Sequence, residues 1–129
     1  MVLDTSALLA LLLDEPEAED FRAAVEDDPT RLVSAATLLE TAIVIEARKG
    51  DAGGRELDLL IRTADMTVVP VETDHVSEAR RAYRRFGRGR HAAGLNFGAV
   101  FAYALARTSG EPLLFKGADF SKTDIRGVP

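Results

Sequence analysis

Two acidic residues stand where a protein with a parallel sheet would place its chemistry. Asp4 directly follows the apolar residues Val2 and Leu3, and Asp119 comes shortly after the apolar run Leu113–Phe115. Ligands of such sheets bind outside the carboxyl ends of the strands, so these two acids could face each other there. Taken alone, Asp4 is equally well explained as a helix N-cap, and Asp119 as a solvated loop acid.

Glu40 is a third acid, and its helical surroundings are unusual. The residues that share its helix face are all apolar: Ala36, Ile43, Val44 and Ala47. We therefore expect this face to point to the core, where an ionised, unpaired glutamate would be strongly unfavourable. Glu40 is then protonated, paired with a buried arginine, or bound to a metal ion.

A cluster of Asp4, Glu40 and Asp119 would make a site for a hard divalent cation. Carboxylate oxygens suit Mg²⁺ or Mn²⁺, and Mg²⁺ keeps several waters that phosphate oxygens can share. The chain has no cysteine and only two histidines, which argues against a structural zinc site. The chemistry that such a site supports is metal-assisted hydrolysis of a phosphodiester. The hydroxyls of Thr5 and Ser6 either cap the following helix or help to bind an anion.

One segment is strongly basic, although the net charge of the chain is −5. Between Arg80 and His91 there is no acid, and Tyr83 and Phe86 alternate with six arginines: Arg80, Arg81, Arg84, Arg85, Arg88 and Arg90. Phosphate is a natural counter-charge for such a group. The segment is either a nucleic-acid contact or an amphipathic helix whose aromatic side chains face the core.

Strands and helices alternate along the chain and would position these residues. The expected strands are Met1–Leu3, Arg31–Ser34, Met66–Val71 and Pro112–Phe115. The expected helices run from Asp4 to Leu12, from Asp14 onward, over Ala36–Lys49, Arg55–Ala64 and Thr73–Phe86, and from Asn96 to Arg107. Gly50 and the Gly53–Gly54 pair separate two of them, and a short polar tail follows Asp119. This order predicts an α/β fold of one domain, residues 1–129, with a parallel sheet covered by helices on both faces. Pro70, which has no N–H group to donate to a neighbouring strand, predicts that the third strand lies at an edge of the sheet.

The composition excludes several classes of protein. A content of 47% hydrophobic and 29% charged residues is typical of a globular protein and excludes wholesale disorder. The longest apolar run, Ala7–Leu13, is far shorter than the ~20 residues of a membrane span, and no basic stretch precedes it. We therefore expect no membrane association and a cytoplasmic location, with which the lack of cysteine agrees.

Three long blocks of the sequence carry a family resemblance. They read MVLDTSALLALLLDEPEAE, SAATLLETAIVIEARKG followed by GGRELD, and YRRFGRGRHAAGLNFG…FAYALARTSGEPLLFKGADFSKTDI. Together they resemble the PIN-domain VapC toxins of type II toxin–antitoxin systems over nearly the whole chain. The resemblance implies a three-layer PIN-like fold and an Mg²⁺- or Mn²⁺-dependent ribonuclease that cuts structured RNA such as tRNA or rRNA. It also implies a homodimer and a cognate VapB antitoxin as partners. Asp4, Glu40 and Asp119 match the family's acids, and Thr5 and Ser6 match the hydroxyls after the first acid.

Ala99 departs from the family pattern. The family places a metal-binding aspartate directly after the block that ends in Gly98, whereas this chain has Ala99 and then Val100. Loss of one carboxylate is expected to weaken metal binding and to lower activity by orders of magnitude. Asn96 can offer only a neutral oxygen in its place. If the ribonuclease assignment holds, we expect Arg88 and Arg90 to contact RNA phosphates.

Other functions fit parts of the sequence. A non-catalytic PIN-like module that holds RNA or an antitoxin is favoured by Ala99. A phosphoacceptor receiver domain shares the size and a lysine, Lys116, but needs a second acid beside Asp4. A haloacid-dehalogenase-like phosphatase needs an aspartate where Ser6 stands. The family resemblance, more than the helical periodicity, also implies that the apolar helices near Phe21 and Leu57 form a groove for a partner helix.

Overall fold

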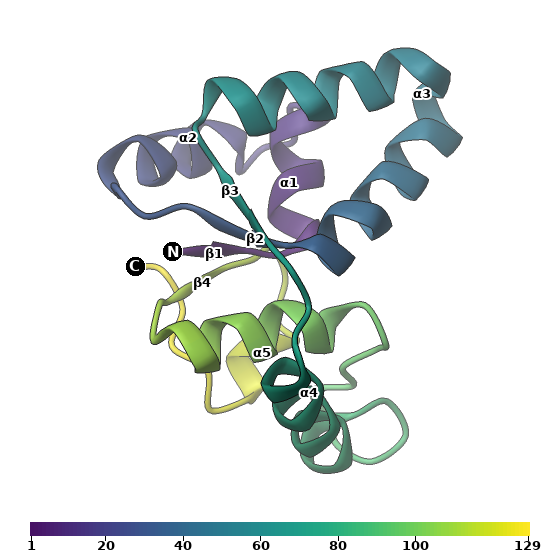
Figure 1. Ribbon diagram of the computed structural model, residues 1–129, viewed down its shortest axis with the longest axis vertical. Helices are drawn as coiled ribbons and strands as arrows, with labels where there is room; N and C mark the ends of the chain where they lie inside the picture. Colours follow the sequence, from purple (N-terminus) through teal and green to yellow (C-terminus); the bar gives the residue numbers. More distant parts are fainter.

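A computed structural model describes all 129 residues and shows a parallel four-stranded sheet between two groups of helices (Figure 1). The strands are short, and their order across the sheet is β3-β2-β1-β4. Their bounds are Val2–Leu3 for β1, Leu32–Ser34 for β2, Thr67–Val69 for β3 and Leu113–Leu114 for β4. β3 lies at an edge, as Pro70 predicted.

Helices cover both faces of the sheet, so the predicted three-layer α/β architecture is confirmed. Figure 1 shows one group of helices on one side of the sheet, and a second group with the C-terminal segment on the other. The first group consists of α1 (Thr5–Leu12), α2 (Ala18–Asp27) and α3 (Ala35–Thr63). The second consists of α4 (Thr73–Phe86), α5 (Ala99–Ser109) and the 3₁₀ turn η1 (Phe120–Lys122). No helix combines the length and the apolar character that crossing a bilayer requires.

The side chains of the neighbouring strands β1 and β4 divide between two apolar cores. Val2 and Leu113 pack with α4 and α5, whereas Leu3 and Leu114 pack with α1 and α3. Successive residues of a strand point to opposite faces of a sheet, so each face receives one residue from each strand. Strands that are buried on both faces read as continuous apolar pairs, which is why the sequence pattern located them.

The longest helix, α3, consists of two arms that meet at Gly50. This glycine has a φ of +63°, a left-handed conformation that an L side chain rarely adopts. The predicted break at Gly50 is therefore correct, but Gly53 and Gly54 lie inside the second arm. A Cβ atom on Gly53 would lie 2.7 Å from the carbonyl oxygen of Ile45. The glycine thus allows the two arms to pack closely.

The first arm of α3 does not present the face of Glu40 to the core, so that prediction is wrong. Its buried side chains are Thr37, Thr41 and Ile45. Leu39 and Ile43, beside Glu40, are 63% and 62% exposed. Helical periodicity shows that an apolar face exists, but it does not say whether the sheet or another surface covers that face.

The tail after Asp119 is not simply polar, because it packs back on the second helical layer. Phe120 is buried, and its ring lies 5.3 Å from that of Phe115, centroid to centroid. Further on, Asp124 accepts a hydrogen bond from the Tyr103 hydroxyl. Burial, with this hydrogen bond as the second cause, raises the pKa of Tyr103 to about 12. The segment that contains Asp119 is therefore anchored at both ends.

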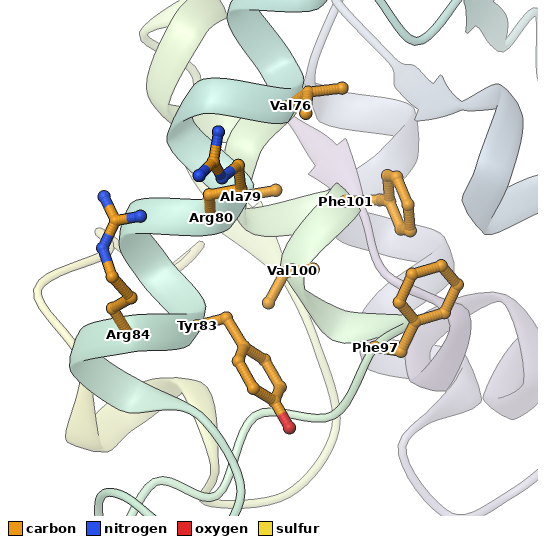
Figure 2. Close-up of a pocket in the computed structure, with 8 residues that line it drawn as sticks. All are labelled: Val76, Ala79, Arg80, Tyr83, Arg84, Phe97, Val100 and Phe101. Atoms are coloured by element: carbon orange, nitrogen blue, oxygen red, sulfur yellow. The ribbon is translucent and has the colours of Figure 1, made fainter.

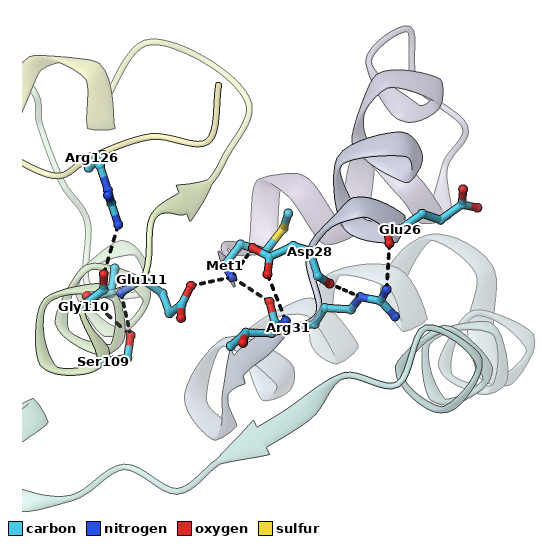
Figure 3. Close-up of polar contacts among 10 residues, drawn as sticks. Met1, Glu26, Asp28, Arg31, Ser109, Gly110, Glu111 and Arg126 are labelled. Carbon is cyan, nitrogen blue, oxygen red and sulfur yellow. Dashed lines mark hydrogen bonds and ion pairs between the residues drawn. The ribbon is translucent and has the colours of Figure 1, made fainter.

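Polar contacts stabilise the end of the sheet at which the parallel strands begin (Figure 3). This end lies opposite the one where the strands lead to Asp4 and Asp119. The Met1 ammonium lies 2.7 Å from Asp28 Oδ2 and 2.9 Å from Glu111 Oε2. The hydrogen bond from this ammonium is the main cause that lowers the pKa of Asp28. The Arg31 guanidinium donates to the carbonyls of Asp28 and Glu26. These contacts join the start of β1 to the segment that leads into β2 and to the residues before β4.

Candidate active site

The structure brings Asp4, Glu40 and Asp119 to the wall of one cavity of about 260 Å³ at the carboxyl edge of the sheet. These acids come from the end of β1, the first arm of α3 and the loop after β4. Crossover connections return each strand in the same direction, so positions far apart in sequence meet at this edge. The other lining residues are Thr5, Ser6, Leu9, Val44, Asn96, Ala99, Lys116 and Phe120.

Asp4 is both the N-cap of α1 and a wall of the cavity. Its Oδ2 accepts hydrogen bonds from the Ser6 amide at 3.1 Å and from the Ser6 hydroxyl at 2.7 Å. The side chain is only 6% exposed, and this burial, with a smaller effect of the charge on Glu40, raises the pKa of Asp4 against the lowering effect of the Ser6 bonds. Its second oxygen, Oδ1, accepts no hydrogen bond from a side chain and is not among the buried, unpartnered atoms, and a weaker backbone contact comes from Thr5. Asp4 therefore retains one oxygen for a ligand in the cavity.

Glu40 lies between α1 and the start of α5. The Thr5 hydroxyl donates to its Oε1 at 2.5 Å. Its Oε2 lies so close to Gly98 that a Cβ atom on this glycine would be 1.9 Å away. No arginine or lysine forms an ion pair with Glu40, so the buried arginine considered from the sequence is not its partner.

Asp119 differs from the other two acids because it is exposed at the rim of the cavity. It stands before η1, and its neighbour Phe120 is buried. No three Asp, Glu, His or Cys side chains lie close enough together to form a ready-made metal site. The carboxylates of Asp4 and Glu40 thus form a neighbouring pair, and Asp119 is a third, more distant oxygen donor.

This donor set fits a hard divalent cation. All the candidate ligands are oxygen atoms, which Mg²⁺ and Mn²⁺ prefer. Asp4, Glu40 and Asp119 form no ion pair with any protein cation, so their negative charge faces the cavity uncompensated. A bound cation would relieve the repulsion between Asp4 and Glu40 that helps raise the pKa of Asp4.

Ala99 is the first residue of α5 and lines the same cavity. Its amide donates to Asn96 Oδ1 at 2.9 Å, so Asn96 binds the first amide of α5, although the N-cap position itself is Gly98. The one side-chain oxygen of Asn96 already accepts this hydrogen bond, which leaves it poorly placed to replace a missing carboxylate. Val100 points elsewhere and is buried.

Thr5 and Ser6 contact the acids themselves. Each hydroxyl donates to a carboxylate: that of Thr5 to Glu40, and that of Ser6 to Asp4. The Ser6 oxygen also accepts the amide of Lys116 at 2.9 Å, which connects the end of β1 with the residues after β4. Both side chains are therefore placed to orient the acids, in addition to any contact with a substrate.

The basic segment lies outside the cavity. Arg88 and Arg90 are exposed in the loop between α4 and α5. Two of the six arginines have acidic partners from outside the segment: Arg81 pairs with Glu78 at 2.9 Å, and Arg85 pairs with Asp124 at 3.3 Å. The aromatic residues divide as well, because Phe86 is buried and Tyr83 is 37% exposed.

An exposed apolar surface beside the cavity was missed in the sequence. Figure 2 shows part of it, a cavity of about 440 Å³ between α4 and the start of α5. A second cavity, of about 460 Å³, lies between the start of α5 and the first arm of α3. Phe97 and Phe101 line both, and Phe97 is 77% exposed. We call this the Phe97 surface; its other large apolar members are Leu39, Ile43, Val76 and Tyr83. The apolar helix face around Glu40 is the sequence feature from which the Phe97 surface could have been predicted.

The groove expected near Phe21 and Leu57 is not formed by these two side chains. Leu57 is buried and Phe21 packs against the core, so neither side chain lines an open groove. A cavity of about 300 Å³ lies beside them between α2 and the end of α3, lined by Leu11, Val25 and Leu60 among others.

Comparison with known proteins agrees with this architecture. The family model of the PIN domain matches residues 1–126. A protein described as Ribonuclease VapC from Mycolicibacterium smegmatis is 59% identical over 128 residues, which cover 99% of both chains. Ribonuclease VapC30 from Mycobacterium tuberculosis is 60% identical over 99% of this chain and 98% of its own.

Two solved structures share the fold at low sequence identity. The first is the crystal structure of Mycobacterium tuberculosis VapC20, described as a toxin that cleaves the Sarcin-Ricin loop. It matches with a TM-score of 0.78 and 18% identity over 96% of this chain and 95% of its own. VapBC2 from Rickettsia felis, bound to a DNA fragment from its promoter, matches with a TM-score of 0.77 and 10% identity over 99% and 96%. The fold and the matching family model thus define a PIN domain. Within that class, the chain belongs to the VapC family of toxin ribonucleases.

Proposed function

We propose that this protein is an Mg²⁺- or Mn²⁺-dependent endoribonuclease toxin that cuts structured RNA such as tRNA or rRNA, and that it is a single PIN domain over residues 1–129. The observation that supports this most directly is the pair Asp4 and Glu40. Two carboxylates without a protein cation line one cavity with Asp119, at the edge of the sheet where ligands bind. Because RNA is the proposed substrate, a cytoplasmic location is proposed as well.

The acids, the two hydroxyls and the two exposed arginines have different parts in this proposal. Asp4, Glu40 and Asp119 would hold the ion, which when bound polarises the phosphodiester and lowers the pKa of an attacking water. The Ser6 hydroxyl orients Asp4 and leaves its Oδ1 free, and the Thr5 hydroxyl orients Glu40. Thr5, Ser6, Arg88 and Arg90 are also proposed to contact the RNA, the two exposed arginines through its phosphates.

Ala99 is proposed to weaken this activity without changing its kind. A carboxylate at this position would face the cavity beside Glu40, and its absence removes one negative charge and one oxygen donor. A non-catalytic module that holds RNA or an antitoxin is the second candidate, and Ala99 is the observation that favours it. The two candidates differ in one measurable property, which is whether RNA cleavage depends on Asp4.

Asp4→Asn is therefore expected to lower Mg²⁺-dependent RNA cleavage by the purified protein at least about tenfold. The amide keeps the size of the side chain but loses the charge that holds the cation, and one lost electrostatic contact of this kind costs about 10²–10³ in rate. The measurement is cleavage of total cellular RNA with Mg²⁺, Mn²⁺ or chelator. Asp20→Asn, an exposed acid on α2, is the matched control and should leave the rate unchanged. Equal rates for the unsubstituted protein and Asp4→Asn would favour the binding module.

The Phe97 surface is proposed to form a homodimer, and a VapB-like antitoxin is proposed as the second partner. Large exposed apolar patches on soluble proteins mark interaction sites. VapBC2 from Rickettsia felis is a structural neighbour whose name combines a toxin with its antitoxin. A surface used by two identical copies meets itself across a two-fold axis, so one substitution enters the interface twice.

Ile43→Glu is expected to convert the dimer to a monomer, because it introduces two buried, unpaired charges at the interface. Light scattering during gel filtration measures the mass of the particle directly. Leu59→Glu is the matched control, since Leu59 is 51% exposed on the second arm of α3 and does not line the Phe97 surface. A monomeric unsubstituted protein, or a dimer that survives Ile43→Glu, would contradict the proposed interface.

A further inference from the structure

Lys116 is the one basic side chain in the cavity of the acids. Among the eleven residues that line this cavity there is no arginine or histidine. Lys116 follows β4, and its amide donates to the Ser6 hydroxyl oxygen at 2.9 Å. That hydroxyl in turn donates to Asp4 Oδ2 at 2.7 Å. The backbone of Lys116 is thus fixed two hydrogen bonds away from the most buried acid.

The ammonium of Lys116 is held away from the acids of the cavity. Its Nζ lies 3.1 Å from Glu15 Oε2 and 3.2 Å from Glu17 Oε2, in the turn between α1 and α2. These two bonds raise the pKa of Lys116, so the side chain stays charged at neutral pH. Asp4, Glu40 and Asp119 therefore keep their charge for a cation, although a lysine lines the same wall.

The bonds that hold this ammonium are easily exchanged. The side chains of Lys116, Glu15 and Glu17 are 37%, 30% and 36% exposed, although the Glu17 Oε2 atom itself is buried, so the pair with Glu15 is the more open of the two. Ion pairs that are open to water contribute little net stability, because solvent competes for both partners. A backbone phosphate that enters the cavity brings two anionic oxygens next to the flexible four-carbon side chain of Lys116. A hydrogen bond from the ammonium to such an oxygen is charge-assisted.

We propose that Lys116 exchanges Glu15 and Glu17 for a phosphate of the bound RNA, and so binds the backbone beside the acidic pair. The inference rests on the proposed ribonuclease function and adds a substrate-binding residue and its resting partners to it. The geometry explains how one cavity can accept a polyanion although three acids line it. The lysine supplies a positive charge at the wall, and the glutamates keep that charge off Asp4 while no RNA is present.

RNA affinity of the purified protein tests this directly, by fluorescence anisotropy of a labelled RNA hairpin over a series of KCl concentrations, with Mg²⁺ and with chelator. Lys116→Ala is expected to weaken binding about three- to tenfold, the worth of one charge-assisted contact. It should also lower the slope of log K against log salt concentration by about 0.7–0.9, the value for one phosphate contact. Lys116→Arg should restore the slope. Lys49→Ala is the matched control, because Lys49 pairs with Glu56 at 3.2 Å far from the cavity.

A second set of variants tests the exchange of partners. Glu15→Gln with Glu17→Gln should tighten RNA binding more in the presence of Lys116 than in its absence, because only then is an ammonium released. Equal effects in both backgrounds would overturn the exchange. An unchanged salt slope for Lys116→Ala, or no RNA binding by the unsubstituted protein, would overturn the RNA contact. If Asp4→Asn leaves cleavage unchanged while Lys116→Ala lowers the slope, the ribonuclease proposal fails and Lys116 remains an RNA contact.

Discussion

Ala99→Asp is expected to raise the rate of Mg²⁺-dependent RNA cleavage by about 10²–10³-fold, the usual effect of one preorganised electrostatic contact at a reacting centre. Ala99 lines the cavity with Asp4 and Glu40, so an aspartate there adds a third acid to the neighbouring pair. A further carboxylate increases both the charge and the number of oxygen ligands available to a divalent cation. Binding of Mn²⁺, measured by calorimetry, should tighten in parallel.

The fold should tolerate this substitution. Ala99 is the first residue of α5, where an acidic side chain interacts favourably with the helix dipole. The first turn of α5 contains no acid at present. With Mg²⁺ present to offset the added negative charge, the melting temperature is therefore expected to stay the same or rise, so a change in rate can be assigned to the site.

Ala99→Asn separates charge from shape in this experiment. Asparagine has the size of aspartate and one similar oxygen, but it adds no negative charge. We expect it to recover only a small part of the rate. Equal rates for Ala99→Asp and Ala99→Asn would show that charge at this position does not matter. No cleavage by Ala99→Asp, on any RNA from its own cell, would exclude the ribonuclease proposal.

Gly98→Ala is expected to reduce cleavage about 10²-fold when it is combined with Ala99→Asp. The new Cβ atom would lie 1.9 Å from Glu40 Oε2 and 2.4 Å from Glu40 Cδ, so the carboxylate must move. Displacement also breaks the hydrogen bond from the Thr5 hydroxyl, which fixes the other oxygen. A misplaced ligand of this kind loses the electrostatic contribution of a properly placed one.

The backbone gives no reason for such a loss, which makes the experiment specific. Gly98 has φ −67° and ψ −40°, values that alanine adopts readily. A Glu40→Ala background is the control: there the methyl group meets no carboxylate, so Gly98→Ala should have no further effect on rate or on Mn²⁺ affinity. A loss of rate that persists in this background would show that Gly98 acts by another route than Glu40.

Local patterns in the sequence were sufficient to predict the strands and helices and part of the candidate site. Apolar pairs such as Val2–Leu3 mark strands that are buried on both faces, and Gly50 marks the bend in α3 because it alone accepts a left-handed φ there. Asp4 could be found because the order of strands and helices along the sequence shows where the first strand ends. Ala99 was recognised as a departure only through the family resemblance, since nothing local distinguishes it from any helical alanine.

Which surfaces meet could only be decided in three dimensions. Glu40 was found through the apolar face around it, yet that face is part of the exposed Phe97 surface rather than of the core, and Thr37 and Ile45 pack inward instead. In the same way, nothing near Lys116 in the chain indicates that its ammonium reaches Glu15 across the sheet edge. Periodicity and residue type record how one segment prefers to fold, whereas contacts between distant segments depend on the free energy of packing all of them at once.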